Sequence, residues 1–261
     1  MSTTREAWSW LLRELDRWAE SGRRADFWWR DDDAFSANRQ LERLLELRTR
    51  HSAPLALAVI PARLDASLGP GLQNHRGVSV LQHGYSHHSH AAAGERKLEL
   101  GGARTSEDIL DDLQQGRQIL QQHFSGRFTP VLVPPWNRID QRIVTALPTI
   151  GFTGISTMRV RRNAWPAKGL RQVNTHLDPV NWRHNGGFIG LYPALGMLIQ
   201  HLVARRSGYR DIDEPTGLLS HHLVQNEAVW RFFDDLLAML CAHPAVNWID
   251  APSIWETPSA E

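Results

Sequence analysis

The chain has 261 residues, of which 29 are Lys or Arg and 28 are Asp or Glu, so its formal net charge is +1. This balance, without a basic block, argues against nucleic acid as a partner. The sequence holds no run of roughly 18 apolar residues and no N-terminal apolar run of signal-peptide length, so we expect no membrane span and a cytoplasmic location. The single cysteine, Cys241, lies in an apolar pattern that predicts a buried core thiol.

Short apolar runs alternate with longer amphipathic segments, which predicts βα units around a mostly parallel sheet. The expected strands are Asp26–Arg30, Leu55–Ile60, Val78–Gln82, Pro130–Val133, Thr153–Ser156, Gln172–Thr175, Gly217–Ser220 and Val246–Ile249. The expected helices are Ala7–Ala19, Arg39–Arg50, Glu107–His123, Gln141–Leu147, Leu195–Arg205 and Ala228–Ala242. We therefore predict an α/β fold with one domain over residues 1–261, a closed or nearly closed barrel whose catalytic groups follow the strands.

Three carboxylates follow the first expected strand, in the stretch FWWRDDDAF. Adjacent carboxylates repel one another, and a turn or helix cap would use only one of Asp31, Asp32 and Asp33. An exposed acidic turn with a helix N-cap is the alternative to a catalytic or metal-binding role.

Four histidines follow the third expected strand, in LQHGYSHHSHAA. If this turn is helical, His83 and His87 share a face and can chelate one ion; a polar turn is the alternative. Together with one carboxylate, two neutral imidazoles form a His₂Asp set that leaves coordination positions open for water and substrate. Residues 91–108, rich in Gly and Ala, are expected to form a surface excursion.

Three later stretches also place polar or aromatic groups after expected strands. In VLVPPWNRID, Trp136 follows Pro134 and Pro135, and this suits either a stiffened loop or a wall against a substrate. QVNTHLDPVNW has an Asp-Pro turn as its simple interpretation. GLLSHHLVQN ends in two histidines, and a histidine in a barrel mouth can act as a general acid, whereas a capping or core histidine is the alternative.

The ordered series RDDDA, HGYSHHSH, VPPWNR, LDPVNW and LLSHH resembles the polysaccharide deacetylase family, the NodB-homology fold of carbohydrate esterase family 4. The resemblance covers residues 26–250 and implies a distorted (β/α)7-8 barrel of that type. In the first motif it implies Asp32 as the general base and Asp33 as a metal ligand, with Asp31 as an extra residue that could shift this register by one.

The second and last motifs complete the implied site. The form HxxxH maps onto His83 and His87 as the other metal ligands. The form Leu-x-x-His maps onto His221 as the general acid, and His222 fits one residue later. Supporting or substrate-binding roles are expected for the remaining motif residues Arg30, Pro135, Trp136, Asp178, Trp182 and His222.

The sequence departs from the family pattern in the third and fourth motifs. The arginine of the third motif is missing near Val133 and Pro134, and the fourth motif ends in Asn181-Trp182 in place of Asp-Trp. Both halves of one supporting ion pair are therefore altered together. We hypothesise that Arg30, next to the aspartates in sequence, takes over the charge compensation.

The resemblance implies a metal-dependent hydrolase that removes an N-acetyl group from an amino sugar by metal-activated water and releases acetate. One divalent ion is expected, Zn²⁺ before cobalt, nickel or iron. The missing secretion signal favours a cytoplasmic N-acetylated sugar over a mature wall polymer, and the sequence carries no indication of an oligomeric state. The alternatives are an amidohydrolase acting on a non-sugar or cyclic amide and a non-catalytic carbohydrate-binding relative.

Overall fold

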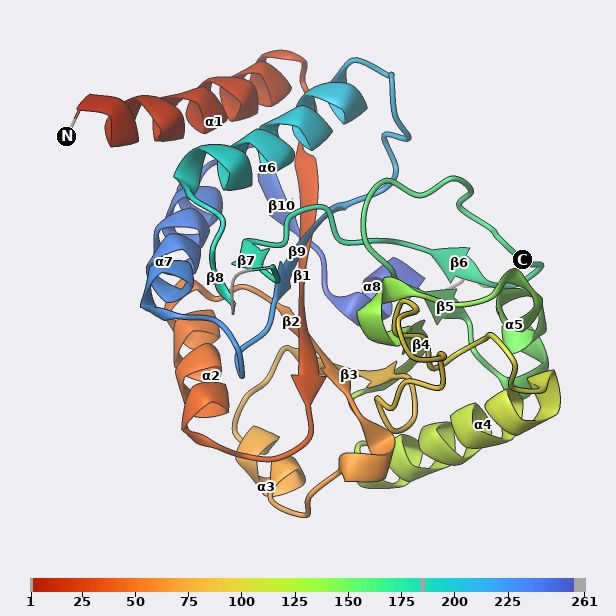
Figure 1. The fold of residues 1–261 in the computed structure, drawn as a ribbon. Coiled ribbons are helices and arrows are strands. Elements are labelled where there is room, and N and C mark those ends of the chain that lie inside the picture. The colour runs from red at the N-terminus through yellow and green to blue at the C-terminus, as the bar shows by residue number, and fades with distance from the viewer. Residues whose placement is uncertain (1, 184–185, 256–261) are drawn as a thin grey trace.

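A parallel sheet forms the centre of the computed structural model, which describes residues 2–183 and 186–255 (Figure 1). The described part has eight strands in this sheet: β1 (Ala25–Ala34), β2 (Leu55–Val59), β3 (Val78–His83), β4 (Phe128–Val133), β5 (Gly154–Ile155), β6 (Arg171–Gln172), β9 (Thr216–Ser220) and β10 (Val246–Trp248). Their order is β10-β1-β2-β3-β4-β5-β6, and β9 also pairs with β1. A single bridge between Met158 and Thr175 extends the pairing of β5 and β6. A second bridge, between Leu177 and Leu218, joins the segment after β6 to β9. The predicted distorted barrel is confirmed.

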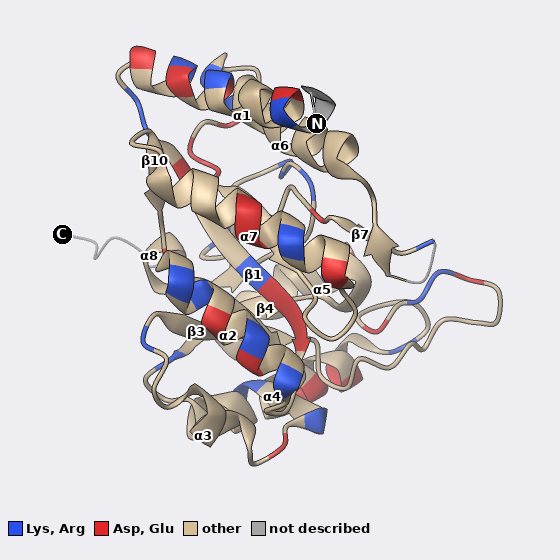
Figure 2. Cartoon of the chain, turned by 90° about the vertical axis from the view of Figure 1, so that its left-hand side faces the viewer, with Lys and Arg blue, Asp and Glu red and all other residues tan. Residues whose placement is uncertain are grey.

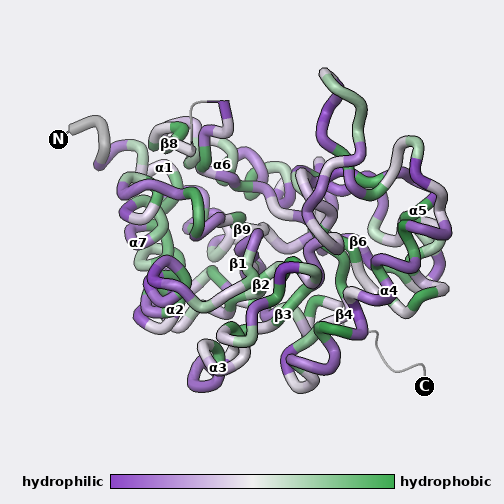
Figure 3. Tube along the Cα trace, turned by 60° about the horizontal axis from the view of Figure 1, so that its bottom comes forward, coloured by the Kyte–Doolittle hydropathy of each residue, from purple (hydrophilic) through white to green (hydrophobic). Residues whose placement is uncertain are grey.

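Helices surround the sheet. The longer ones are α1 (Ser2–Glu20), α2 (Arg39–His51), α4 (Ser106–His123), α6 (Leu191–Arg206) and α7 (Glu227–Ala242), and the shorter ones are α3 (Leu68–Leu72), α5 (Gln141–Ala146) and α8 (Ala251–Trp255). Helices α2 and α7 lie on one side of the sheet and α4 and α5 on the other (Figure 1). In Figure 3, α2 and α7 carry hydrophilic and hydrophobic residues in turn, as helices that bury one face do. No described helix has the length and apolarity needed to cross a bilayer.

Short elements that the sequence analysis did not predict complete the chain. They are the 3-10 turns η1 (Pro61–Arg63), η2 (Pro135–Asn137) and η3 (Leu147–Ile150), the helices α3 and α8, and the two-stranded pair β7 (Val180–Asn181) and β8 (Gly187–Phe188). The six predicted helices are all present, with ends moved by no more than five residues. At α4, the Thr105 side chain accepts a hydrogen bond from the Asp108 amide, as the capping pattern requires.

Alternation along β1 separates two apolar layers. Phe27 and Trp29 pack in the layer between the sheet and helices such as α2 and α7. Trp28 faces the other way, into a layer inside the barrel with Leu81 and Val131. A third layer lies between the sheet and α4 and α5. Because strand side chains alternate, Arg30 and Asp32 share the interior face with Trp28, whereas Asp31 shares the outer face with Trp29.

Three expectations about local structure were wrong. Strand β1 does not end at Arg30 but continues to Ala34, so all three aspartates lie within it, and the N-cap of α2 is Asn38. Cys241 is exposed, because it lies on the outer face of α7. The excursion after the histidines returns to the core, where Glu99 and Leu100 are fully buried.

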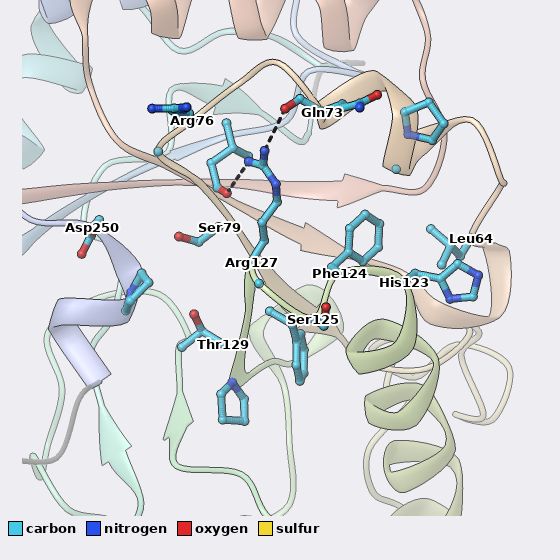
Figure 4. Close-up of a pocket in the computed structure, with 18 of the residues that line it drawn as sticks. Leu64, Gln73, Arg76, Ser79, His123, Phe124, Ser125, Arg127, Thr129 and Asp250 are labelled. Carbon is cyan, nitrogen blue, oxygen red and sulfur yellow. Dashed lines mark hydrogen bonds between the residues drawn. The ribbon is translucent and has the colours of Figure 1, made fainter.

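A cavity of about 1090 Å³ lies at the opposite end of the barrel from the predicted site. It is lined by residues at the beginnings of β3 and β4, including Ser79 and Thr129, and by the end of α4 and α8. Figure 4 shows Arg127 there, bonded to the Gln73 carbonyl oxygen of the α3 segment. The Arg127 guanidinium is thus used to bind a backbone carbonyl group close to it. The apolar layer inside the barrel separates the cavity from the aspartates of β1.

Candidate active site

The predicted base, acid and metal ligands lie together at the C-terminal ends of β1, β3 and β9. In the second half of strand β1, Arg30 is followed by the three aspartates, which Figure 2 shows as a blue band followed by a red one. The register between β1 and β2 shifts between Asp31 and Ala34, and Asp33 has a φ of 72°. This bulge interrupts the alternation, so Asp32 and Asp33 both face the site although they are adjacent.

Asp33, His83 and His87 converge on one point. Asp33 Oδ1 lies 3.2 Å from His83 Nε2 and 3.2 Å from His87 Nε2. The turn between the histidines is not helical, contrary to the condition set from sequence: Gly84 and His87 have φ values of 55° and 57°. Left-handed backbone at these two positions, not a helix face, brings the imidazoles together.

Hydrogen bonding shows why a cation fits at this point. His83 Nδ1 lies 2.9 Å from the Val133 carbonyl oxygen, which can only accept, so Nδ1 carries a proton and Nε2 turns its lone pair toward Asp33. Asp33 Oδ1 is buried and has no hydrogen-bond partner among the described residues. A proton on one imidazole satisfies one of the two 3.2 Å contacts, whereas a metal ion satisfies both. The three residues therefore fit a divalent metal ion.

The close approach of Asp33, His83 and His87 shifts their pKa values. Burial raises the pKa of Asp33, but the close contact with His83 and the charges of the nearby histidines outweigh it and hold the pKa well below its ordinary value. Burial lowers the pKa of His83, yet the contact with Asp33 raises it above the ordinary value overall. Burial, followed by the charge of His83, lowers the pKa of His87 to about 4.

A second group of the same residue types, His176, His201 and Glu214, is buried between α6 and β9. Here the Gly217 N–H donates to His176 Nδ1 over 3.0 Å, so the proton of the neutral ring lies on Nε2 and points toward Glu214 Oε2, 3.5 Å away. The rings of His176 and His201 stack at 3.5 Å. A protonated nitrogen offers no lone pair to a metal ion, so this group fits one poorly.

Arg30 is fully buried and holds Asp32. Its Nε lies 2.8 Å from Asp32 Oδ1 and its Nη2 3.0 Å from Oδ2, a bidentate pair. The other guanidinium protons reach Asn137 Oδ1 at 3.1 Å and Ser156 Oγ at 2.7 Å. Asn137 and Ser156 were not anticipated from sequence, because nothing in their local patterns indicates that they meet an arginine more than 100 residues away.

His221 lies on the other side of Asp32. Its Nε2 is 3.9 Å from Asp32 Oδ2, and its Nδ1 is buried without a partner among the described residues. The ring of Trp182 meets that of His221 edge to face at 4.6 Å, and the Trp182 indole N–H donates to Asp178 Oδ2 over 2.7 Å. Burial raises the pKa of Asp178, although the charge of His221 lowers it in part. These contacts therefore link Asp178 to Trp182 and Trp182 to His221.

Asp31 and His222 pair with each other on the outer face of β1, away from the metal ligands. Asp31 Oδ1 lies 2.5 Å from His222 Nδ1, and its Oδ2 accepts hydrogen bonds from Ser220 Oγ (2.6 Å) and the His222 amide (3.0 Å). Both side chains are essentially inaccessible to solvent. This geometry leaves Asp32 and His221, rather than Asp31 and His222, facing the site, and the pair fixes the chain on either side of His221.

Pro135 and Trp136 form the wall beside His87. The Trp136 ring centroid lies 4.5 Å from that of His87, and Lys97 Nζ lies 5.6 Å above the indole. Trp136 and Asn137 both have positive φ. Of the six described non-glycine residues with positive φ, four lie in this site, namely Asp33, His87, Trp136 and Asn137. Strain of this kind is held where surrounding contacts require it, commonly at functional sites.

Solved structures of polysaccharide deacetylases and other members of carbohydrate esterase family 4 share this fold. A protein from Mycobacterium smegmatis described as a polysaccharide deacetylase matches with 17% identity and a TM-score of 0.56, over 89% of this chain and 88% of its own. An acetyl xylan esterase from Clostridium thermocellum, solved with a cobalt ion, matches with 13% identity and a TM-score of 0.55, over 88% and 89%. The resemblance inferred from the motifs is confirmed at the level of the fold.

A variant of the peptidoglycan deacetylase PdaC from Bacillus subtilis also matches, with 12% identity and a TM-score of 0.53, over 88% of this chain and 90% of its own. The neighbours further include a pseudoenzyme of the same family from Bacillus anthracis. No protein-family model and no curated protein sequence matches the chain.

Proposed function

We propose that this protein is a metal-dependent hydrolase that removes the acetyl group from an N-acetylated amino sugar, with Asp33, His83 and His87 as ligands of one divalent ion, Zn²⁺ by preference. The observation that carries the proposal is the convergence of two imidazole nitrogens on the partnerless Oδ1 of Asp33, with Asp32 and His221 beside it. A bound divalent ion at such a site makes water more acidic and polarises the acyl oxygen.

The side chains around the ligands supply the proton transfers. Asp32, held by Arg30 in one orientation, accepts the proton of the attacking water. His221, on the far side of Asp32 and steadied by the Trp182 ring, donates a proton from Nε2 to the departing amine, because an amine anion is a poor leaving group. The backbone N–H near Trp136 stabilises the oxyanion. Arg30 thereby provides the charge compensation that the third motif lacks.

The mouth of the site offers flat apolar faces. The Trp182 side chain is 54% exposed, and Trp136 and Tyr85 are partly exposed at neighbouring strand ends. Indole rings stack well on the apolar faces of pyranose rings. The structural neighbours include proteins named for peptidoglycan and acetyl xylan, which supports an acetylated carbohydrate as the substrate class.

The test measures metal content and acetate release together. Purified untagged protein is analysed for transition metals, and then incubated with N-acetylglucosamine oligomers, with O-acetylated xylan and with a cyclic amide, in the presence of Zn²⁺ or Co²⁺. Acetate from the N-acetylated oligomers supports the proposal. Acetate from xylan alone makes the protein an esterase, ring opening alone makes it a cyclic amidohydrolase, and oligomer binding without turnover makes it a non-catalytic relative.

A further inference from the structure

The turn that carries His87 is held by a side chain twelve residues later in the chain. Glu99 is fully buried, and its Oε1 accepts hydrogen bonds from the Tyr85 amide (3.1 Å), the Ser86 amide (2.7 Å) and Ser86 Oγ (3.2 Å). Three donors on one carboxylate oxygen fix the path of the backbone between the two histidines. Neither His83 nor His87 takes part in these three hydrogen bonds.

This turn needs an external partner because it is not a regular element. Left-handed backbone at a non-glycine residue such as His87 is strained and persists only where neighbouring contacts impose it. The Tyr85 and Ser86 amides, in the middle of the turn, donate to Glu99. Without that acceptor, two amide groups near the protein interior would lose their partner, and the turn would relax toward a less strained path.

Glu99 is itself held firmly. The next residue, Leu100, is fully buried and bridges to Ile139, just after the Pro-Pro-Trp stretch. The other carboxylate oxygen of Glu99 lies so close to Gly84 that a Cβ atom there would be 2.4 Å away, and the same Cβ would be 2.6 Å from the Pro135 ring. Gly84 is therefore enclosed between Glu99 and Pro135, and the turn has no room to shift toward either.

We propose that Glu99 is a positioning residue for the metal site: it sets the turn that directs His87 Nε2 at Asp33. This inference rests on the proposed function, because it assumes that His87 binds a metal ion. Hydrogen-bond partners behind metal ligands commonly contribute 10- to 100-fold to metal affinity. Glu99 acts one step further back, on the backbone that carries the ligand.

The experiment compares Glu99→Leu with Glu214→Leu, since leucine has a similar size but no acceptor oxygen. Glu214 is a matched control, because it is equally buried and its carboxylate also accepts two backbone N–H groups, from Asn174 and Arg161, away from the predicted ligands. Zn²⁺ affinity of the full chain is measured by calorimetry with a competing chelator. We expect Glu99→Leu to weaken Zn²⁺ binding at least ten-fold, on the order of the effect of hydrogen-bond partners behind ligands. Glu214→Leu should stay within about two-fold of the original chain.

Amide hydrogen exchange of the metal-free protein gives a second readout. Glu99→Leu should speed exchange at Tyr85 and Ser86 while the strands β2 and β3 keep their protection. If Glu99→Leu does not fold, Glu99→Asp, which keeps the charge but shortens the reach, takes its place with the same expectations.

Three results overturn the inference in distinguishable ways. Unchanged Zn²⁺ affinity in the Glu99 variant overturns it and leaves the proposed function standing. An equal loss in Glu214→Leu shows that general destabilisation, not positioning, weakens the site. Absence of Zn²⁺ binding in the original chain overturns the proposed function and this inference with it.

Discussion

Two groups in this molecule each combine two histidines with one carboxylate, and they differ in what lies behind the imidazoles. In the group of Asp33, His83 and His87, a backbone carbonyl accepts a hydrogen bond from the Nδ1–H of His83, so the Nε2 lone pair faces the carboxylate. In the group of His176, His201 and Glu214, a backbone N–H occupies Nδ1 of His176, so a proton faces the carboxylate. Residue type and proximity are thus insufficient to define a metal site. The hydrogen-bond partner of Nδ1 determines whether Nε2 has a lone pair free for a metal ion.

The largest expected effect tests this difference directly. His83→Ala or His87→Ala should lose the bound metal and nearly all activity, because each removes one of three ligands. His201→Ala, in the second group, should retain about one equivalent of metal, as one intact site requires. Elemental analysis of the three purified variants checks this, and loss of the metal from His201→Ala would show that the comparison is wrong.

Replacing the proposed base should remove activity without removing the metal. Asp32→Asn keeps the shape of the side chain but cannot accept a proton, so kcat should fall roughly 10²- to 10⁴-fold. Metal content should match that of the original chain, since Asp33 is the ligand. A variant that loses both would place Asp32 among the ligands. Steady-state kinetics together with elemental analysis separates the two results.

Loss of the buried arginine should have a smaller effect on catalysis. Arg30→Met leaves Asp32 without its bidentate partner, so kcat should fall about ten-fold or more. The matched control is Arg205→Met, which removes an equally buried arginine that bonds to Thr216 Oγ1 beside the second group. The control should lower the melting temperature and leave kcat unchanged. A normal kcat in Arg30→Met would remove the charge-compensation role from Arg30.

The smallest expected effect is a pH dependence located in the second group. Burial raises the pKa of Glu214 to about 7. A pKa that is higher in the folded than in the unfolded state contributes stability that is full below the unfolded value and is lost as the pH rises through the folded value. Melting temperatures measured from about pH 5 to about pH 8 should therefore decline less steeply for Glu214→Gln than for the original chain. Parallel curves for the two proteins would contradict a raised pKa at Glu214.

Much of the fold follows from local patterns in the sequence. The buried strand β2 is a continuous apolar run, β3 begins with Val-Ser-Val-Leu, and α4 has both its periodicity and its Thr105 cap in the sequence. The extent of β1 could not be predicted, because three aspartates in a row argue against a strand. They are accommodated because Asp31 points outward to His222, while a bulge lets Asp32 face Arg30 and Asp33 face His83 in the site.

The convergence of Asp33, His83 and His87 could be predicted, whereas the way it is achieved could not. The spacing of the two histidines suggested a helix, but left-handed residues and the distant Glu99 shape the turn. Asn137 and Ser156, which bond to Arg30, and the second histidine group are brought together from segments far apart in sequence. Such long-range partners depend on the packed barrel and leave no local pattern.

The apolar layer inside the barrel closes the interior below the candidate site. Trp28, Leu81 and Val131 fill the interior below Arg30 and Asp32, and α8 packs against this layer from the opposite end. The route to Asp32 therefore starts at the C-terminal strand ends, and a molecule that enters there must also leave there.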